Sequence, residues 1–576
     1  MTPRPSHLQI SSVAPHLSCI SQLQHRSLAS NCYSTTAMAP HNVEVEAITD
    51  TTGVPLPDPL AAPMPINDIR GRRKKAEKST WGVAAPANSE RFKSYSHSHK
   101  PKAKRWDHYI STESKSRKGN SLKNAAKYLG KPGLISLGGG LPSSEYFPFD
   151  SLDLTMPSVG KYSEQETKEE GVKVHVGKHD LAEDKSIFDI ATAFNYGQGH
   201  GAAQLLRWVT EHTELIHNPP YADWACHMTI GSTSALEMSL RIFTQPGDYI
   251  LSEDYTFATA IETAAPMGVK VAGVKMDDQG LLPDSLDQVL TNWDSAARGG
   301  ARKPFVLYTV PSGQNPTGAT QGAERRREIY KVAQKHDLYI FEDEPYYFLQ
   351  MDPYGGPDAA TPEPPASHAE FLKEIVPSLL SMDVDGRVLR MDSFSKVVSP
   401  GSRVGWITGA QQIVERYSKH ADVSTQGPSG MSQLILFKLL DEHWGHSGYI
   451  DWLIHIRKEY THRRDVMLRA CDKFLPKDVV SWKPPMAGMF HWLQIDWRKH
   501  PHASTKSLTE LEDDIFQLII EHGALVMKGS WFYAEPDAAH DTMFFRATFA
   551  AAPADKIQEA IHRFGDAIRE SFKLKN

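Results

Sequence analysis

The protein has 576 residues, enough for two or three domains with large buried cores. Hydrophobic residues make up 40% of the chain and charged residues 23%, and 63 basic against 69 acidic side chains give a net charge of -6. This balance gives no indication of a nucleic-acid-binding protein or of an acidic disordered one. The four cysteines include no C-x-x-C pair, so we predict neither a zinc site nor a disulfide framework. No run of about 18 apolar residues occurs, and we expect no membrane-spanning helix.

Residues 1–43 have the composition of a targeting leader. They contain no Asp, Glu or Lys, and they hold eight Ser together with Arg4 and Arg26. Such a start resembles a mitochondrial presequence, and Arg26-Ser27-Leu28-Ala29 resembles a matrix-protease cleavage site. The alternative is a disordered leader that translation from Met38 would bypass. The predicted location is therefore the mitochondrial matrix or the cytoplasm.

Composition divides the rest of the chain into four segments. Residues 44–107 form a basic arm rich in Pro and Ser, whose basic runs are Arg70–Lys75 and Lys100–Arg105. Such runs can bind nucleic acid, but an arm lying over the protein or over a partner subunit is the favoured interpretation. We predict an N-terminal segment of a small domain over 108–190, a large domain over 191–430 and the rest of the small domain over 431–576. Glu164–Lys185 and Asp352–Ala366 are predicted to be surface loops.

Short apolar runs alternate with helical patterns between about residues 195 and 409. Strands are predicted at Phe305–Val310, Leu338–Phe341, Val388–Met391 and Val404–Ile407, and Glu324–Asp337 has helical spacing. This alternation predicts a layered α/β sheet. After Met431 the pattern predicts two long helices, a strand at Gly488–Ile495 and a last helix from Pro553 to about Lys573, which together indicate a smaller α+β domain.

The segment Ser393–Arg403 carries the strongest chemical signal, because it places one lysine between two predicted strands. Desolvation on a buried loop lowers the pKa of a lysine, and the neutral amine of Lys396 can then attack a carbonyl. Ser393, Ser395 and Arg403 flank it, and hydroxyls with a guanidinium suit a phosphate dianion. Pyridoxal phosphate carries both an aldehyde and a phosphate, so it is the predicted cofactor.

Three further segments supply the remaining parts of such a site. Ser232 and Thr233 open a predicted helix, where backbone N–H groups bind phosphate; an ordinary N-cap is the alternative. Asn315 follows a predicted strand and can donate to the cofactor's phenolate oxygen, although alone its segment is a Gly/Pro turn. Asp343 can keep the pyridine nitrogen protonated, and Tyr346 can share the phenolate, although an acidic strand end is commonly just solvated. We interpret the four segments together as one site.

With these motifs the chain resembles a fold-type I, pyridoxal-phosphate-dependent aminotransferase of class I/II. More narrowly, it resembles the fungal aromatic amino acid and 2-aminoadipate aminotransferases through Lys100–Trp106, Leu134–Phe149 and Glu342–Gln350. The resemblance runs from about residue 65 to the end. It implies an α/β fold in which a large αβα domain with a mixed sheet accompanies a smaller α+β domain, and it implies a homodimer with shared active sites.

The resemblance also implies a role for each matching residue. Lys396 bonds the cofactor covalently and carries the proton, with Asp343 and Tyr346 as the other catalytic residues. The implied cofactor ligands are Ser232, Thr233, Phe257, Asn315, Asp343, Tyr346, Ser393, Ser395, Arg403 and, from the neighbouring subunit, Tyr196. The implied substrate contacts are Arg546, Gly140, Leu141, Asn315 and Phe257.

The implied reaction moves the amino group of an aromatic amino acid to 2-oxoglutarate, giving the aromatic 2-oxo acid and glutamate. Kynurenine and 2-aminoadipate remain open as donors. Another fold-type I enzyme, such as a decarboxylase or a lyase, would use the same lysine and is an alternative. A transcription regulator that senses pyridoxal phosphate is a third, but residues 1–107 show no packed-helix pattern for a DNA-binding domain.

Overall fold

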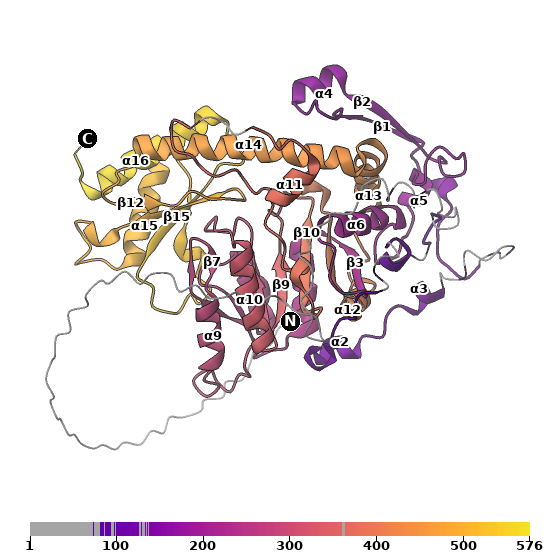
Figure 1. Ribbon diagram of the computed structural model, residues 1–576, viewed down its shortest axis with the longest axis horizontal. Coiled ribbons are helices and arrows are strands. Elements are labelled where there is room, and N and C mark those ends of the chain that lie inside the picture. Colours follow the sequence, from indigo (N-terminus) through magenta and orange to yellow (C-terminus); the bar gives the residue numbers. More distant parts are fainter. Residues whose placement is uncertain are drawn as a thin grey trace, which may run out of the picture. The chain divides into compact units, whose positions relative to one another are not determined.

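The computed structural model describes residues 81–359 and 363–575 with short gaps before residue 137, and it also describes Ile69 and Arg73. The predicted leader lies outside these residues. Within them, a seven-stranded sheet and a four-stranded sheet form the two centres of the fold (Figure 1).

The seven-stranded sheet is mixed. Its strand order is β3-β11-β10-β9-β8-β4-β5, and only β11 runs antiparallel to its neighbours. The strands are β3 (Trp224–Thr229), β4 (Tyr249–Glu253), β5 (Lys270–Val274), β8 (Val306–Thr309), β9 (Tyr339–Asp343), β10 (Val388–Ser393) and β11 (Gly405–Ala410). All seven strands are largely buried, as expected of a parallel sheet that is covered on both faces.

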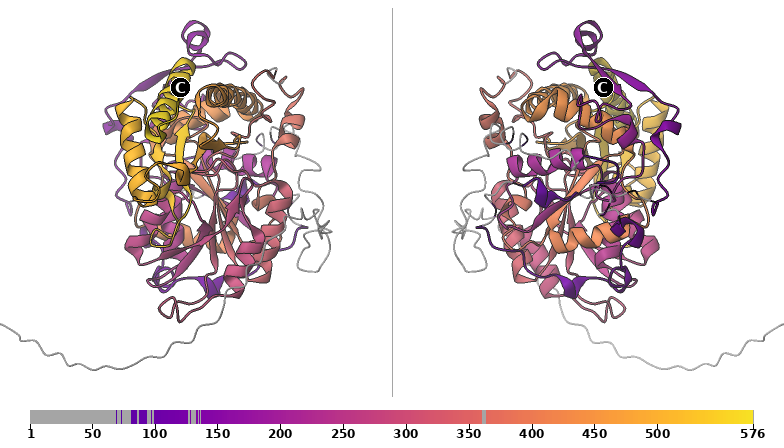
Figure 2. Two further views of the ribbon diagram at one scale, coloured as in Figure 1. Left: turned by 90° about the vertical axis from the view of Figure 1, so that its left-hand side faces the viewer. Right: turned by 90° about the vertical axis from the view of Figure 1, so that its right-hand side faces the viewer.

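Side-chain alternation along the strands builds a core on each face of this sheet. Ile250, Val306 and Phe341 pack in one cluster with residues of α7 (Gly231–Phe243). Their chain neighbours Leu251, Leu307 and Ile340 pack in another cluster with residues of α9 (Pro283–Thr291) and α10 (Ala323–Lys335). Figure 2 shows the helices on both sides of the sheet. Successive side chains of a strand point to opposite faces, so the continuous apolar runs are what such a three-layer arrangement requires.

The remaining helices complete these layers and cover the second sheet. They are α2 (Thr112–Ser116), α3 (Ser121–Ala125), α5 (Ile190–Ala193), α6 (Ala203–Ile216), α8 (Ala258–Ala264), α11 (His368–Glu374), α12 (Gln411–Ala421), α13 (Gly430–Phe437), α14 (Gly445–Phe474), α15 (Leu508–Glu521) and α16 (Ala554–Phe572). A π-helical segment, Lys438–His443, joins α13 to α14. None of the described helices is both long and apolar enough to cross a membrane.

The four-stranded sheet is antiparallel, with the order β12-β13-β15-β14. Its strands are β12 (Val480–Trp482), β13 (Phe490–Ile495), β14 (Met527–Lys528) and β15 (Met543–Thr548). Helices α14, α15 and α16 pack together beside it. Ser507 begins α15 with a capping box, since its side chain accepts from the Glu510 N–H and Glu510 accepts from the Ser507 N–H.

The predicted elements are recovered with small shifts at their ends. The strands predicted at 305–310, 338–341, 388–391, 404–407 and 488–495 correspond to β8, β9, β10, β11 and β13. The prediction of a loop over Glu164–Lys185 is wrong. This stretch contains α4 (Glu164–Glu170) and strand β2 (Val172–Gly177), which pairs with β1 (Ser151–Met156) in a projecting hairpin (Figure 1). Valines at 172, 174 and 176 alternate with polar residues, and the surrounding charges obscured this strand pattern.

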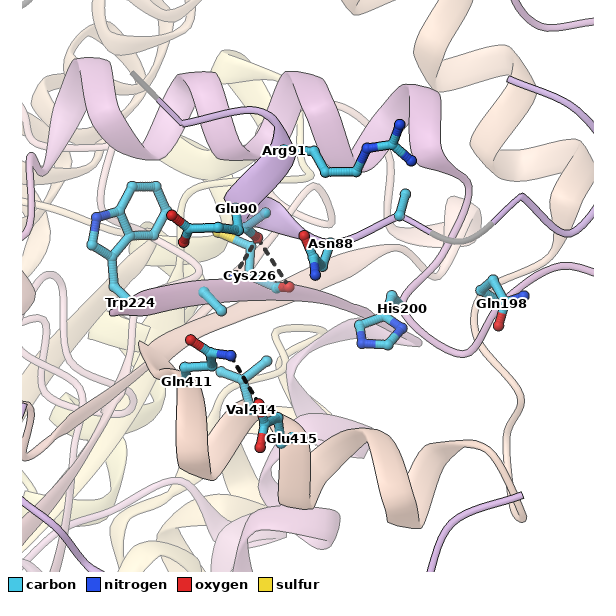
Figure 3. Close-up of a pocket in the computed structure, with 13 residues that line it drawn as sticks. Asn88, Glu90, Arg91, Gln198, His200, Trp224, Cys226, Gln411, Val414 and Glu415 are labelled. Atoms are coloured by element: carbon cyan, nitrogen blue, oxygen red, sulfur yellow. Dashed lines mark hydrogen bonds between the residues drawn. The ribbon is translucent and has the colours of Figure 1, made fainter. Parts of the chain in front are cut away.

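The part of the basic arm that the structure describes covers the open edge of the large sheet. Strand β3 lies at that edge, and the Ser89 hydroxyl accepts from the Cys226 N–H at 2.7 Å and donates to the Cys226 carbonyl at 3.3 Å. Figure 3 shows Cys226 on β3 next to the segment that carries Asn88 and Glu90, beside a cavity of about 330 Å³. Further back in the arm, Arg73 lies within 2.6 Å of carboxylate oxygens of both Glu211 and Asp441. The arm therefore satisfies backbone groups and charges that would otherwise be left unpaired.

We expect Ser89→Ala to lower the free energy of unfolding by about 1 to 3 kcal/mol, because the change leaves a buried backbone N–H of β3 without its acceptor. Thermal or denaturant unfolding measures the change. The matched control is Ser116→Ala, whose exposed hydroxyl donates to the Glu113 carbonyl and whose loss should cost less than about 0.5 kcal/mol. Equal effects of the two changes would contradict a stabilising role for the arm.

Candidate active site

The chemical residues follow the carboxyl ends of the parallel strands. Asp343 ends β9, Ser393 ends β10, and Asn315 lies in the turn after β8. Gly231, Ser232 and Thr233 follow β3 and begin α7, and Phe257 follows β4. Strands that run in the same direction deliver these segments to one edge of the sheet, where open α/β sheets bind their ligands.

These segments enclose a cavity of about 240 Å³. Ten predicted residues line it: Ser232, Thr233, Phe257, Asn315, Asp343, Tyr346, Ser393, Ser395, Lys396 and Arg403. The rest of the lining comes from Leu236, Tyr308, Val310, Pro345, Pro400 and Phe490. Residues 232 and 490 are far apart in the sequence, and only the fold makes them neighbours.

One end of the cavity collects hydroxyls and a guanidinium. The Ser393 hydroxyl donates to the Ser395 hydroxyl at 2.8 Å, and Arg403 Nη1 donates to the same Ser395 oxygen at 3.2 Å. Ser232 and Thr233 face this group from the first turn of α7. Arg403 has no carboxylate partner among the described residues, since its remaining hydrogen bonds go to the carbonyls of Pro400 and Ile230. An unneutralised guanidinium beside hydroxyls and a helix N-terminus matches the needs of a phosphate dianion.

Backbone geometry brings Arg403 close to α7. Arg403 itself has φ +51°, in the left-handed region, and Gly231 has φ +76°. A Cβ atom at position 231 would lie 2.3 Å from Arg403 Nη2. Only glycine at this position allows both the positive φ and the close approach of the guanidinium.

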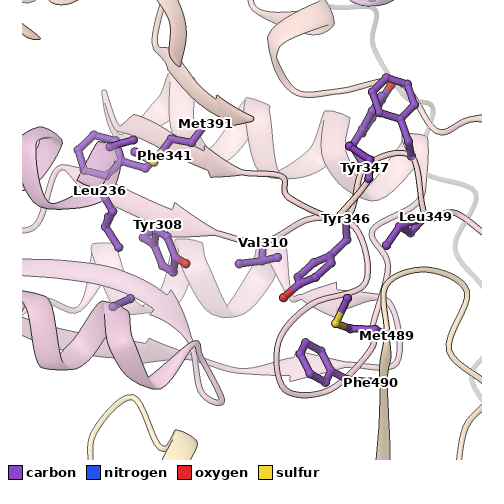
Figure 4. Close-up of a cluster of buried hydrophobic side chains, with 14 of the residues drawn as sticks. Leu236, Tyr308, Val310, Phe341, Tyr346, Tyr347, Leu349, Met391, Met489 and Phe490 are labelled. Atoms are coloured by element: carbon purple, nitrogen blue, oxygen red, sulfur yellow. The ribbon is translucent and has the colours of Figure 1, made fainter. Parts of the chain in front are cut away.

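The cavity also holds a buried carboxylate, that of Asp343, and the Ser232 hydroxyl lies close enough to it to counteract part of the rise in its pKa. The Tyr308 hydroxyl donates to Asp343 Oδ2 at 2.8 Å, while Asp343 Oδ1 is buried without a hydrogen-bond partner among the described residues. Burial raises the pKa of Asp343 from 3.8 to about 6. In Figure 4 the hydroxyls of Tyr308 and Tyr346 point toward each other across Val310.

The unsatisfied atoms test whether pyridoxal phosphate suits this cavity. Besides Asp343 Oδ1, the Ser232 hydroxyl is buried without a hydrogen-bond partner among the described residues. Both atoms have hydrogen-bonding capacity that the described residues do not use and that a polar ligand in this cavity could use. A protonated pyridine nitrogen would satisfy the carboxylate, and a phosphate would satisfy the hydroxyl. The residues present therefore fit the cofactor.

Lys396 lines the same cavity from the connection between β10 and β11. Partial burial lowers its pKa from the usual value of 10.5, and the positive charges of Arg403 and Arg546 lower it further. Its ammonium makes no hydrogen bond with the described residues. A lysine of this kind has a larger share of neutral amine near pH 7, which is the form that attacks a carbonyl and accepts a proton.

Arg546 is fixed by contacts on three sides. Its Nη1 donates to Asn315 Oδ1 at 2.7 Å, and its guanidinium carbon lies 4.4 Å from the Phe490 ring centre and 4.7 Å from that of Phe532. It has no carboxylate partner among the described residues, and burial lowers its pKa. The Arg546 guanidinium is therefore held against two aromatic rings, and its remaining N–H groups can donate two parallel hydrogen bonds to a carboxylate.

Four predicted residues do not line this cavity: Arg546, which contacts it through Asn315, and three residues that are exposed. Tyr196 is 61% exposed, Leu141 is 38% exposed, and Gly140 is also exposed. Sequence reasoning missed Tyr308 and Phe532. Tyr308 lies inside an apolar strand, where an aromatic residue normally signals core packing, and Phe532 is connected to the site only through its contact with Arg546 in the folded chain. Neither has a local signal that would have revealed its role.

If Arg546 binds the substrate carboxylate, as the resemblance implies, Arg546→Lys should raise KM for the amino acid by about 10- to 100-fold with a smaller change in kcat, because lysine keeps the charge but loses the two-pronged contact. Steady-state kinetics with L-phenylalanine measures the effect. Arg498→Lys is the control, since Arg498 is an exposed residue paired with Asp541 in the same part of the chain. A fall in kcat at unchanged KM would contradict carboxylate binding by Arg546.

Comparison with known proteins places this site in a family. A family model for aminotransferase class I and II matches residues 158–564. An aromatic amino acid aminotransferase of Schizosaccharomyces pombe is 46% identical over 470 residues, covering 81% of this chain and 98% of the relative. The mitochondrial kynurenine/alpha-aminoadipate aminotransferase of Bos taurus is 32% identical over 478 residues, covering 80% and 99%. The crystal structure of aminotransferase Aro8 from Candida albicans is 42% identical with a TM-score of 0.77, covering 82% and 100%.

The predicted fold class and the predicted family are both confirmed. The large mixed sheet with helices on both faces, the smaller antiparallel sheet and the match over 158–564 agree with one another. The chain belongs to the class I and II aminotransferase family.

Proposed function

We propose that the protein is a pyridoxal-phosphate-dependent aminotransferase that moves the amino group of an aromatic amino acid to 2-oxoglutarate. One observation carries this proposal: Lys396, Asp343 and a cluster of phosphate-type donors line a single cavity, and Arg546 touches it through Asn315. The relatives support the substrate class. The S. pombe relative is named for aromatic amino acids, and one from Tapinella panuoides, 32% identical, is named L-tyrosine:2-oxoglutarate aminotransferase.

Each residue then has a physical task. When bound, pyridoxal phosphate supplies an aldehyde that bonds an amine and a ring that withdraws electrons from the adjacent carbon. Asp343 would hold a proton on the ring nitrogen, and Asn315 and Tyr346 would donate to the ring oxygen. Ser232, Thr233, Ser393, Ser395 and Arg403 would bind the phosphate. Lys396 would remove the proton from the α-carbon of the amino acid and return it to the carbon that was the aldehyde carbon of the cofactor.

Substrate selection follows from the walls of the cavity. Arg546 would bind the α-carboxylate, because it has no carboxylate partner among the described residues and its guanidinium donates only to Asn315 among them. Phe257 and Phe490 line the same cavity. Two aromatic walls favour a flat apolar side chain over a charged one, since burying an unpaired charge is costly.

The decisive experiment is an absorbance titration of the purified, cofactor-loaded protein. The visible band of the lysine-bound cofactor should fall on addition of L-phenylalanine alone and return on addition of 2-oxoglutarate. Mass analysis should identify phenylpyruvate rather than phenylethylamine, which separates transamination from decarboxylation. A loaded protein whose band does not respond to any aromatic amino acid would overturn the substrate assignment, and a protein with no such band would overturn the cofactor assignment.

We also propose a homodimer with shared active sites. Large apolar side chains between residues 122 and 196 are exposed in the single chain, with Ile135 at 88%, Leu137 at 95% and Tyr146 at 79%. So many large apolar side chains exposed in one segment support a partner that covers them. The same segment holds Gly140, Leu141 and Tyr196, the predicted residues that do not reach their own cavity. Light scattering should give twice the mass of one chain, and a monomer at catalytic concentrations would contradict the proposal.

Residues 1–43 are proposed to direct the protein to the mitochondrial matrix. The absence of acidic residues and the Arg26–Ala29 site support this, and the Bos taurus relative is named as mitochondrial. A fluorescent protein fused to residues 1–45 should accumulate in mitochondria. A fusion that stays in the cytosol would remove this proposal and leave the reaction untouched.

A further inference from the structure

A second cavity, of about 270 Å³, lies behind the turn that carries Asn315. Asn315 lines the candidate active site, whereas Thr317, Gly318 and Ala319 of the same turn line this second cavity. The two cavities share no lining residue. The other walls come from residues 276–278 and from strands β12, β13 and β15 of the small sheet. The cavity therefore lies between the small sheet and the segments that follow β4, β5 and β8, and the Asn315 turn separates it from the candidate active site.

Aromatic side chains form one wall of the second cavity. The rings of Trp492 and Phe544 are stacked with centres 4.9 Å apart and planes 14° apart, and Tyr255 meets both edge-on at 5.3 Å. Trp482 adds a fourth ring to the lining. All four side chains are only partly buried. A half-buried aromatic wall beside an open cavity favours a flat, apolar guest that completes its burial.

Two opposite charges without partners line the same cavity. Asp277 is neutralised by Arg325 at 2.9 and 3.0 Å, but the neighbouring Asp278 has no hydrogen bond or ion pair among the described residues. Lys483, on the opposite side, also has none among them. One anion and one cation around an aromatic wall are complementary to a zwitterion that carries an aromatic ring.

The walls are connected to both substrate-binding groups. Gln314 Nε2 donates to the Tyr255 carbonyl at 2.6 Å, and the Thr317 N–H and hydroxyl donate to Gln314 Oε1 at 3.0 and 2.7 Å. These bonds hold the turn on which Asn315 sits. Trp492 is directly opposite Arg546 in the β13–β15 pairing, so both side chains project from the same face of the small sheet. A guest in this cavity would touch the immediate neighbours of Asn315 and Arg546.

We propose that this cavity is an effector site for a free aromatic α-amino acid, separate from the active site. The ring stacks on the wall of Trp482, Trp492 and Phe544, the ammonium group faces Asp278, and the carboxylate faces Lys483. Occupation fixes the Asn315 turn against the small sheet and so adjusts the position of Arg546. The site goes beyond the proposed transamination, because it makes the enzyme responsive to the concentration of a compound that is not reacting.

The test uses the loaded enzyme with its active site chemically closed. Borohydride reduction fixes the cofactor permanently to Lys396, so an added amino acid cannot exchange with it. Isothermal titration with L-phenylalanine should then show saturable binding of one equivalent per chain. No measurable binding to the reduced enzyme would overturn the proposal while leaving the proposed reaction intact.

Substitutions assign the binding to the second cavity. Lys483→Met and Asp278→Asn, both at exposed positions, should each weaken binding about two- to fivefold. Trp482→Ala should weaken it about tenfold. The control Lys477→Met removes another exposed lysine, one that is paired with Asp472 outside the cavity, and should leave binding unchanged. Binding that survives Lys483→Met and Asp278→Asn but is lost in Arg546→Lys belongs to the active site and overturns the proposal.

Discussion

Lys396→Ala is expected to reduce turnover of L-phenylalanine by about 10⁴-fold or more while the protein still binds pyridoxal phosphate. The lysine provides both the covalent attachment and the group that moves the proton, and general acid–base catalysis alone is worth about 10² to 10⁴. Cofactor binding survives because Arg403, the hydroxyl cluster and Asp343 are independent of the lysine. Single-turnover kinetics measures the rate, and ultrafiltration measures the retained cofactor.

Two companion variants separate the lysine's charge from its chemistry. Lys396→Arg keeps a cation at the site, but a guanidinium does not lose its proton near neutral pH, so this variant should be as inactive as the alanine variant. Lys499→Ala removes an exposed lysine that is paired with Asp496 at 3.2 Å, and it should be fully active. Near-native turnover by Lys396→Ala, or activity retained by Lys396→Arg, would show that another group carries the proton.

The central parts of the fold and site were predictable because the signals are local. Lys396, Asp343 and Asn315 each follow an apolar run that predicts a buried strand, and strands that run in the same direction bring their carboxyl ends to one edge. Each motif carries little information alone. Their joint placement at strand ends is what identifies the site, and the structure brings ten of these residues around one cavity.

Contacts between distant segments were not predictable. Arg73 reaches Glu211 and Asp441 across more than a hundred residues, and no pattern near Arg73 indicates a partner. The ion pair depends on where α6 and the π-helical segment lie in the folded chain.

The β1–β2 hairpin was missed for a different reason. Its residues alternate between apolar and polar, but the adjacent run of charges in α4 is typical of a solvated loop. The alternation of apolar and polar residues does not by itself decide between a strand and a solvated loop.

Asp343→Asn is expected to lower kcat by about a thousandfold. The carboxylate would keep a proton on the ring nitrogen, and a charge pair about 4 Å apart at an effective dielectric of 20 is worth about 4 kcal/mol. Asparagine is similar in size, so the cavity keeps its shape, and only the charge is lost.

The pH profile of cofactor affinity supplies a second measurement. The pKa of Asp343, about 6, predicts that the affinity of the wild-type protein for the cofactor falls as the pH drops below 6. The variant should lack this transition.

The same substitution should have the opposite effect on the stability of the cofactor-free protein. Burial raises the pKa of Asp343 from 3.8 to about 6, so between these values the folded state binds more protons than the unfolded state. Stability is therefore lost as the pH rises through this window, and at pH 7 the ionised carboxylate costs about 1 to 3 kcal/mol. The neutral amide of the variant would carry no such cost, and thermal unfolding at pH 7 should show a more stable cofactor-free variant, with the difference disappearing below about pH 4. A variant that is both slower and less stable at pH 7 would indicate that Asp343 supports the fold, because removing a charge that is buried only for the sake of the cofactor should stabilise the cofactor-free protein.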